Sequence, residues 1–139
     1  MTTIAYKDQI IAYDSRSVSG DVIVDDCFIK KTKVKGVVFF VVGNPSDLEE
    51  FQEMYFGETG SEKLGCDALV VDEGIVYVCG VEKGKIWKDK VDKPTTLGSG
   101  AQFALAAMDC GCTAVEAVKV AAKRDIYTGG RIRKYIIGG

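Results

Sequence analysis

Short alternating or continuous runs of hydrophobic residues predict strands along most of the chain. The run from Val37 to Val42 is apolar throughout, as expected for a strand that is buried on both faces. Asp8-Gln9, Glu73-Gly74 and Lys83-Gly84 stand between such runs and predict tight hairpin turns. We therefore expect strands at residues 2–7, 10–13, 37–42, 68–71, 75–81, 85–87 and 131–137, and a β-rich stretch over 22–34 that is interrupted by Asp25-Asp26.

Three segments carry the signals of helices. The first begins at Ser46-Asp47-Leu48-Glu49, which has the spacing of a capping box with Pro45 just outside it, and stops near Gly57. An Ala-rich helix is predicted over residues 101–108, and a second capping box opens a helix over residues 113–124. The order of strands, helix, strands, two helices and strand predicts an α+β fold, with two antiparallel sheets packed together and helices outside.

Length and charge narrow the class of protein. The 139 residues predict one domain spanning 1–139, and the formal net charge of −2 gives no reason to expect nucleic acid or an anionic membrane as a partner. No apolar run approaches the roughly 20 residues that a membrane-spanning helix needs. The N-terminus lacks a basic segment followed by an apolar one, so we expect no signal peptide and a cytoplasmic location.

The titratable residues limit the chemistry that the chain can perform. It contains no His, which excludes Ser-His and Cys-His nucleophiles and the usual zinc sites. The five cysteines show no C-x-x-C spacing, so we expect reduced thiols and no metal site. Catalysis would have to use Thr, Ser, Lys, Asp or the N-terminal amine.

The first residues, Met1-Thr2-Thr3, offer such a nucleophile. Methionine is usually trimmed before a residue as small as Thr, which would make Thr2 the new N-terminus. An N-terminal Thr carries a hydroxyl that can attack a carbonyl and a free amine that can take the proton. An α-amine titrates at about 8, so a useful neutral fraction exists near neutral pH.

Several motifs downstream of Thr2 resemble those of one family. Thr2-Thr3-Ile4, Asp14, the region of Lys30, Gly43, Gly98-Ser99-Gly100-x-x-x-Ala104 and Asp125-x-x-Thr128-Gly129-Gly130 follow one another in the order seen in proteasome β-type subunits and HslV-like peptidases. The resemblance spans nearly the whole chain. It implies an N-terminal nucleophile (Ntn) hydrolase with a four-layer αββα sandwich fold.

The resemblance also implies roles for residues near the N-terminus. Thr2 would be the nucleophile, and Thr3 is the alternative, which would require an extra cleavage. Lys30 fits the K-x-x-x-V/L/I pattern of the catalytic lysine through Val34, with Lys31 as the second choice. Asp14 would pair with this lysine and keep it charged, because a buried lysine without a partner tends to lose its proton.

The remaining roles fall on the loops. Gly43 would donate its backbone N–H to the developing oxyanion, an interaction worth about 3 kcal/mol in comparable sites. Ser99 would relay a proton to the Thr2 amine, and Asp125 and Thr128 would hydrogen-bond around the amine and Ser99. No cofactor is required, although carbonyls of the Asp125–Thr128 loop could hold a monovalent or divalent cation, as in some relatives.

The chain departs from the family in its helices. After the Ser46 helix, relatives continue into a second long helix, whereas here a brief Gly-rich loop leads directly to Ala68. We therefore expect a reduced helical layer, which leaves a stacked double ring and an ATPase unfoldase partner as open questions. The function implied is a threonine peptidase acting on peptides or unfolded proteins as a homo-oligomer. The alternatives are an amidase on the same fold and, if Met1 is retained, an inactive assembly module.

Overall fold

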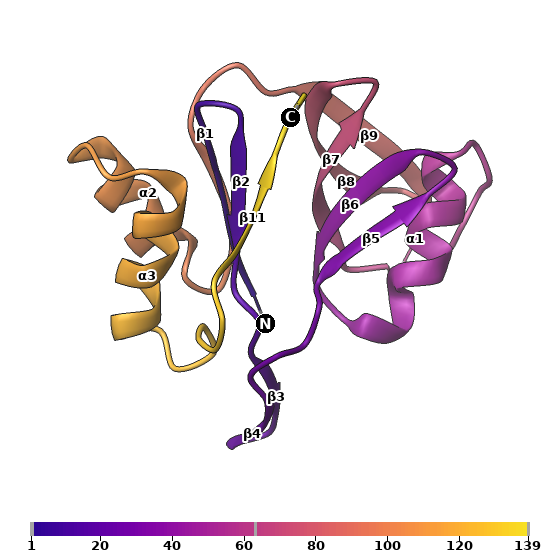
Figure 1. Cartoon of the computed structure of the whole chain (residues 1–139). Helices are drawn as coiled ribbons and strands as arrows, with labels where there is room; N and C mark the ends of the chain where they lie inside the picture. Colours follow the sequence, from indigo (N-terminus) through magenta and orange to yellow (C-terminus); the bar gives the residue numbers. More distant parts are fainter. Residues whose placement is uncertain (1, 63, 139) are drawn as a thin grey trace. The chain divides into compact units, whose positions relative to one another are not determined.

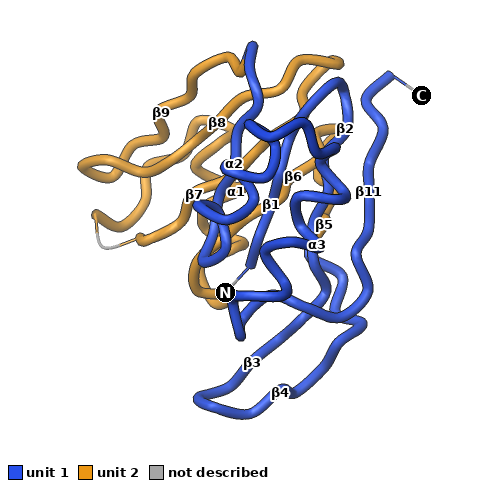
Figure 2. Tube along the Cα trace, turned by 90° about the vertical axis from the view of Figure 1, so that its left-hand side faces the viewer, with its two compact units in different colours: residues 1–30, 92–139 blue, residues 31–91 orange. Residues whose placement is uncertain are grey.

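A computed structural model describes residues 2–62 and 64–138, and the chain divides into two compact units. The terminal unit contains residues 1–30 and 92–139, and the insert unit contains residues 31–91; Figure 2 colours them blue and orange. The division rests on contacts alone and does not show whether either unit folds by itself, so the single domain expected over residues 1–139 stays a prediction.

The terminal unit is built on a four-stranded antiparallel sheet in the order β10-β1-β2-β11. A separate two-stranded hairpin, β3-β4, follows the end of β2. The elements are β1 (Thr3–Lys7), β2 (Ile10–Tyr13), β3 (Ser17–Ser19), β4 (Val22–Asp25), β10 (Thr95–Gly98), α2 (Ala101–Asp109), α3 (Ala114–Arg124) and β11 (Arg133–Ile136).

Helices α2 and α3 lie together on one face of this sheet (Figure 1). Ala5 and Ala12 project from neighbouring positions of β1 and β2 into a buried cluster with α3 residues Ala117 and Ala121. Small side chains on both partners let the helix backbone approach the sheet closely, so the Ala-rich sequence reflects tight packing. Helix α3 opens with the predicted capping box of Thr113 and Glu116.

The insert unit is a five-stranded antiparallel sheet in the order β5-β6-β7-β8-β9. Strand β6 lies between β5 and β7, which confirms the buried strand predicted from its apolar run. Helix α1 buries Phe51 and Met54 in a cluster with Phe39 and Val70 of the sheet. The elements are β5 (Lys31–Val34), β6 (Val37–Val42), the 3-10 helix η1 (Pro45–Asp47), α1 (Leu48–Tyr55), β7 (Asp67–Asp72), β8 (Ile75–Glu82) and β9 (Lys85–Lys90).

The start of α1 differs from the prediction. Asn44, and not Ser46, caps this segment, because its side-chain oxygen accepts the Ser46 N–H at 3.1 Å. Pro45 begins the 3-10 turn that precedes α1, so it lies inside the helical segment. A proline is well suited to that position because its φ is already helical and it has no N–H to leave unpaired.

Two strands were not predicted, and β7, β8 and β9 are longer than expected. Ser17–Ser19 (β3) and Thr95–Gly98 (β10) form strands where none was expected, and β9 continues to Lys90. The β-rich stretch 22–34 forms two separate strands, β4 and β5, which belong to different sheets. The expected hairpin turn at Glu73-Gly74 is present, with positive φ at both residues. No helix among the described residues is long and apolar enough to cross a membrane.

Candidate active site

Asp14 is the point at which several segments of the terminal unit meet. It follows β2 directly, its side chain is fully buried, and each carboxylate oxygen accepts two hydrogen bonds. Oδ1 accepts from the Thr3 N–H at 3.1 Å and the Lys30 ammonium at 2.8 Å. Oδ2 accepts from the N–H groups of Gly129 at 3.0 Å and Arg16 at 3.3 Å. Because an ionised carboxylate only accepts hydrogen bonds, four donors satisfy it completely.

Lys30 is the cationic partner that the sequence analysis expects for Asp14. Its side chain is only 6 % exposed and the Asp14 side chain 0 %, so both charges of this ion pair are removed from water. Burial lowers the pKa of Lys30, and the nearby Asp14 carboxylate opposes this without cancelling it. Lys30 therefore gives up its proton more readily than an exposed lysine does.

Asp125 collects a second set of polar groups. It stands at the C-terminal end of α3, where its N–H donates to Ala121 at 2.8 Å. Its Oδ2 accepts hydrogen bonds of 2.6 Å from the hydroxyls of Ser99 and Thr128, and Oδ1 accepts from the Tyr127 N–H at 3.1 Å. Burial acts to raise the pKa of Asp125, but these hydrogen bonds outweigh it and lower the pKa below its usual value.

The Thr3 hydroxyl is buried and hydrogen-bonded within the terminal unit. It lies 2.6 Å from the Thr128 hydroxyl and accepts a hydrogen bond from the Gly100 N–H at 3.0 Å. Since Thr128 donates its only proton to Asp125, Thr3 must be the donor to Thr128. Thr3 is also fully buried, so its hydroxyl serves the packing of the terminal unit.

Thr2 lies one residue before β1, beside the Gly98-Ser99-Gly100 turn. Its carbonyl accepts the Ser99 N–H at 2.9 Å, and its exposure is 7 %. Gly98 has φ of 103°, and a methyl group there would collide with the Thr2 carbonyl. Glycine is therefore required at position 98 both for its backbone conformation and for the close approach of Thr2. Met1, whose removal the sequence analysis expects, lies outside the described residues.

Arg16 is a positioning residue that the sequence analysis did not single out. Its guanidinium holds Asp26 through Nε at 2.9 Å and Nη2 at 3.3 Å, and Nη1 donates to the Ile126 carbonyl at 3.1 Å. It lies against Gly129, where any side chain would collide with it. This contact explains why position 129 of the Thr128-Gly129-Gly130 motif is a glycine, and no short sequence pattern predicts it.

The other two predicted residues belong to the insert unit. Gly43 follows β6 with φ of 127°, and a Cβ there would lie 2.5 Å from the Gly65 carbonyl oxygen. Its glycine is thus explained within the insert unit, and its role as an oxyanion donor stays a prediction. Lys31 is the first residue of β5, whereas Lys30 is the lysine that contacts Asp14.

A metal site built from side chains is not present among residues 2–62 and 64–138, where no group of three Cys, Asp or Glu side chains is placed to hold an ion. The cation expected near the Asp125–Thr128 loop would be bound by carbonyl groups and stays a prediction.

Comparisons with known proteins place this geometry in context. No protein-family model and no curated protein sequence matches the chain. Among solved structures, Thiobacillus denitrificans BPH in complex with epoxomicin is 15 % identical with a TM-score of 0.70, and the match covers 99 % of both chains. HslV from Trypanosoma brucei is also 15 % identical with a TM-score of 0.70, over 97 % of both chains.

These similarities extend over nearly the whole chain and confirm, at the level of fold, the resemblance predicted from the sequence. The chain therefore has the α+β fold of the HslV-like Ntn hydrolases.

Proposed function

We propose that this chain is a threonine-type peptidase whose nucleophile is Thr2, exposed by removal of Met1. The observation that carries the proposal is the convergence of two polar clusters, one buried and one partly exposed, at the start of β1. One is the Asp14–Lys30 ion pair, which also holds the Thr3 N–H. The other is the Ser99–Asp125 hydrogen bond, joined to Thr2 through the Ser99 N–H.

The proposed reaction proceeds through an ester on Thr2. The Thr2 hydroxyl oxygen attacks the carbonyl carbon of a peptide bond while the Thr2 α-amine takes the hydroxyl proton. The carbon–nitrogen bond then breaks, and the departing amine leaves with that proton. A water molecule, activated by the same amine, attacks the ester, releases the new carboxylate product and restores the Thr2 hydroxyl.

The surrounding residues have supporting roles in this proposal. Lys30 supplies a cation that favours the deprotonated hydroxyl and lowers the pKa of the amine, and Asp14 keeps Lys30 charged and in place. Ser99, held by Asp125, relays a proton to or from the amine, and Thr128 fixes Asp125. Gly43 would donate its N–H to the oxyanion, a role that rests on the resemblance alone.

Thr2 is preferred to Thr3 because the two side chains have different surroundings. The Thr3 hydroxyl uses its one proton and one acceptor site inside the unit, and its N–H is held by Asp14. Freeing Thr3 as a nucleophile would break these contacts and leave buried polar atoms unpaired, at about 1–3 kcal/mol for each such atom.

The substrate class and assembly follow from the same proposal. We infer that the chain acts on peptides or unfolded proteins as a cytoplasmic homo-oligomer, and the five free cysteines fit a reducing compartment. Helix α1, of 8 residues, is the one α-helix described in the insert unit. With this reduced layer, the proposal includes neither a stacked double ring nor an ATPase unfoldase partner, and both stay open.

The test is the intact mass of the purified protein before and after treatment with epoxomicin, the compound present in the similar BPH structure. We expect the loss of one Met and the gain of one adduct, located at Thr2 by fragmentation. Thr2→Ala should abolish the adduct, while Thr3→Ser, which keeps a hydroxyl at the neighbouring position, should retain it. An adduct on the Thr2→Ala protein would refute Thr2 as the nucleophile.

Two further outcomes separate the alternatives. Retained Met1 with no adduct would remove the peptidase and leave an assembly module. A Thr2 adduct without cleavage of any peptide library member, but with hydrolysis of small non-peptide amides, would indicate an amidase on the same fold.

A further inference from the structure

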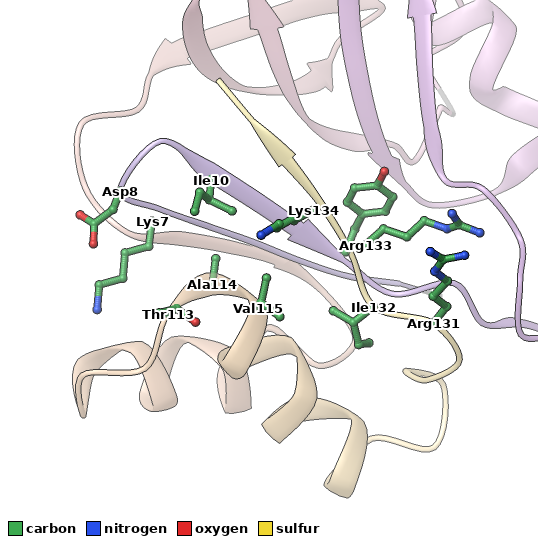
Figure 3. A pocket seen from close by; sticks show the side chains of 11 residues that line it. Lys7, Asp8, Ile10, Thr113, Ala114, Val115, Arg131, Ile132, Arg133 and Lys134 are labelled. Carbon is green, nitrogen blue, oxygen red and sulfur yellow. The ribbon is translucent and has the colours of Figure 1, made fainter. Parts of the chain in front are cut away.

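A groove lies in the terminal unit between the N-terminal end of α3 and the sheet edge formed by β11 (Figure 3). Its volume is about 670 Å³. Ile10, Ala114, Val115 and Ile132 line it with apolar surface. None of the residues assigned to the Thr2 site lines it, so the proposed catalysis does not account for it.

The charged residues of the groove are mostly cationic. Lys7, Arg131, Arg133 and Lys134 line it together with one carboxylate, Asp8, in a chain whose net charge is −2. Figure 3 shows Lys7 and Asp8 at one end, Arg131 and Arg133 at the other, and Lys134 between them.

These cations are only partly used within the fold. Lys7 donates to the carbonyls of Met108 and Cys112, and Arg133 donates to Ser15. The side chains of Arg131 and Lys134 have no hydrogen-bond or ion-pair partner among the described residues. The groove thus concentrates net positive charge beside an apolar surface.

The backbone groups of Lys134 and Ile136 face the outer edge of β11, because Ile137, in the alternate phase, is the residue that donates its N–H to Gln9 on the side of β2. This strand is the last in the order β10-β1-β2-β11, and among the described residues it pairs with β2 alone. Its outer edge can therefore accept the backbone of another extended segment. Lysine on an edge strand often only prevents such pairing. Here, however, the edge adjoins an apolar groove with a second unpartnered cation.

We propose that the β11 edge and its groove bind an extended acidic peptide segment of a partner protein, which adds to the sheet as a fifth strand. Successive side chains of a strand point to opposite faces. One set would place apolar side chains over Ile10 and Val115, with a carboxylate near Lys134. The other set would place carboxylates near Arg131 and Arg133.

The apolar lining and the strand edge favour a peptide over a nucleic acid. A nucleic acid would be bound through its phosphates and through bases stacked on aromatic rings. Tyr13 is the one aromatic residue that lines the groove, and it is buried. Aliphatic surface beside an unpaired strand edge instead matches the alternate side chains and the backbone of an extended peptide.

The test is fluorescence anisotropy of a labelled eight-residue peptide with the intact protein. The peptide alternates glutamate and valine, except that one central valine is replaced by glutamate to supply the carboxylate near Lys134. Two control peptides carry lysine in place of glutamate, or proline at two valine positions to remove backbone N–H groups. Lys134→Glu and Arg131→Glu are compared with Lys93→Glu, the same charge change at an exposed position of the terminal unit outside the groove. The Thr2→Ala protein is measured in parallel, so that the result does not depend on cleavage at Thr2.

We expect the acidic peptide to bind and the two control peptides to bind at least tenfold more weakly. Lys134→Glu and Arg131→Glu should each weaken binding at least tenfold, while Lys93→Glu and Thr2→Ala leave it unchanged. Bound peptide should also slow amide hydrogen exchange in β11. No binding, an equal loss with Lys93→Glu, unaltered binding of the proline peptide, or tighter binding of a single-stranded oligonucleotide would each overturn the proposal.

Discussion

Replacing Asp14 with Asn tests whether the buried ion pair with Lys30 supports the terminal unit. The substitution keeps the size of the side chain and removes its charge. Asn has one acceptor oxygen where Asp14 has two. Its NH₂ group, itself a donor, must therefore replace one of the two oxygens and face that oxygen's donors. Those donors are either the Lys30 ammonium with the Thr3 N–H, or the N–H groups of Arg16 and Gly129.

The expected loss can be bounded in two ways. Breaking one partner of a buried ion pair costs about 3–5 kcal/mol because the other charge is left uncompensated. Lys30 can escape this by losing its proton, which at pH 7 costs about 4.6 kcal/mol for a lysine with an ordinary pKa of about 10.4. The two values are similar, so we expect the free energy of unfolding to fall by about 3–5 kcal/mol at pH 7.

The stability of the Asp14→Asn protein should also depend on pH in a definite direction. In the Asp14→Asn protein the pKa of Lys30 falls further, so between this lowered pKa and about 10.4 the unfolded chain binds more protons than the folded one. Stability therefore rises with pH in that window. At pH 9 the cost of deprotonation is only about 1.9 kcal/mol, so the deficit relative to the wild type should shrink.

The assay is urea denaturation followed by circular dichroism at pH 7 and pH 9. Asp92→Asn is the matched control, because Asp92 is exposed and its side chain makes no hydrogen bond or ion pair among the described residues. It should leave the stability unchanged. A loss below about 1 kcal/mol for Asp14→Asn, or a deficit that grows with pH, would show that the charge of Lys30 does not depend on Asp14.

Three further predictions concern the loops and the thiols. Gly98 and Gly111 have similar positive φ values of 103° and 101°, and alanine at either position would be strained by about 1–3 kcal/mol. Only at Gly98 would the added methyl group also collide, with the Thr2 carbonyl. Gly98→Ala should therefore be the more destabilising in urea and should also lose epoxomicin labelling. Arg16→Ala should accelerate amide hydrogen exchange of Tyr127 and Gly129 about tenfold, as expected for loss of one charge-assisted hydrogen bond. Arg16→Lys should restore only part of the protection, because an ammonium lacks the two-pronged geometry, and full restoration would argue for charge alone. Burial raises the pKa of Cys66 to about 11 and of Cys79 to about 12, so at pH 8 a thiol reagent should modify exposed Cys27 and Cys110 and reach the buried pair only after unfolding.

The sequence predicted the fold well where the signal was local. Glu73-Gly74 and Lys83-Gly84 marked their turns because both positions need positive φ, and the apolar run of β6 marked a central strand. The polar strands β3 and β10 were missed because three or four residues rich in Ser, Thr and Gly show no hydrophobic alternation. The cap of α1 was wrong because Asn44 and Ser46 are both good capping residues, and spacing alone does not decide between them.

The candidate site was less predictable because its contacts join distant parts of the chain. Thr2 and Thr3 are chemically identical in sequence, and only the hydrogen bonds from Thr3 to Thr128 and Gly100 distinguish them. Arg16 and Asp26 carried no motif, since their significance comes from the loop at Ile126. The candidate residues were found through their order along the chain, which resembles that of a family.

The donors to Asp14 have a consequence for synthesis of the protein. Thr3 and Arg16 are made early, but Gly129 is 115 residues beyond Asp14, near the other end of the sequence. Asp125 and Thr128, which complete the second cluster, are made equally late. A nascent chain on the ribosome therefore lacks Asp125, Thr128 and Gly129 until translation is almost finished. If Thr2 is the nucleophile, this delay would protect the cell's other unfolded chains from an enzyme that is still being made.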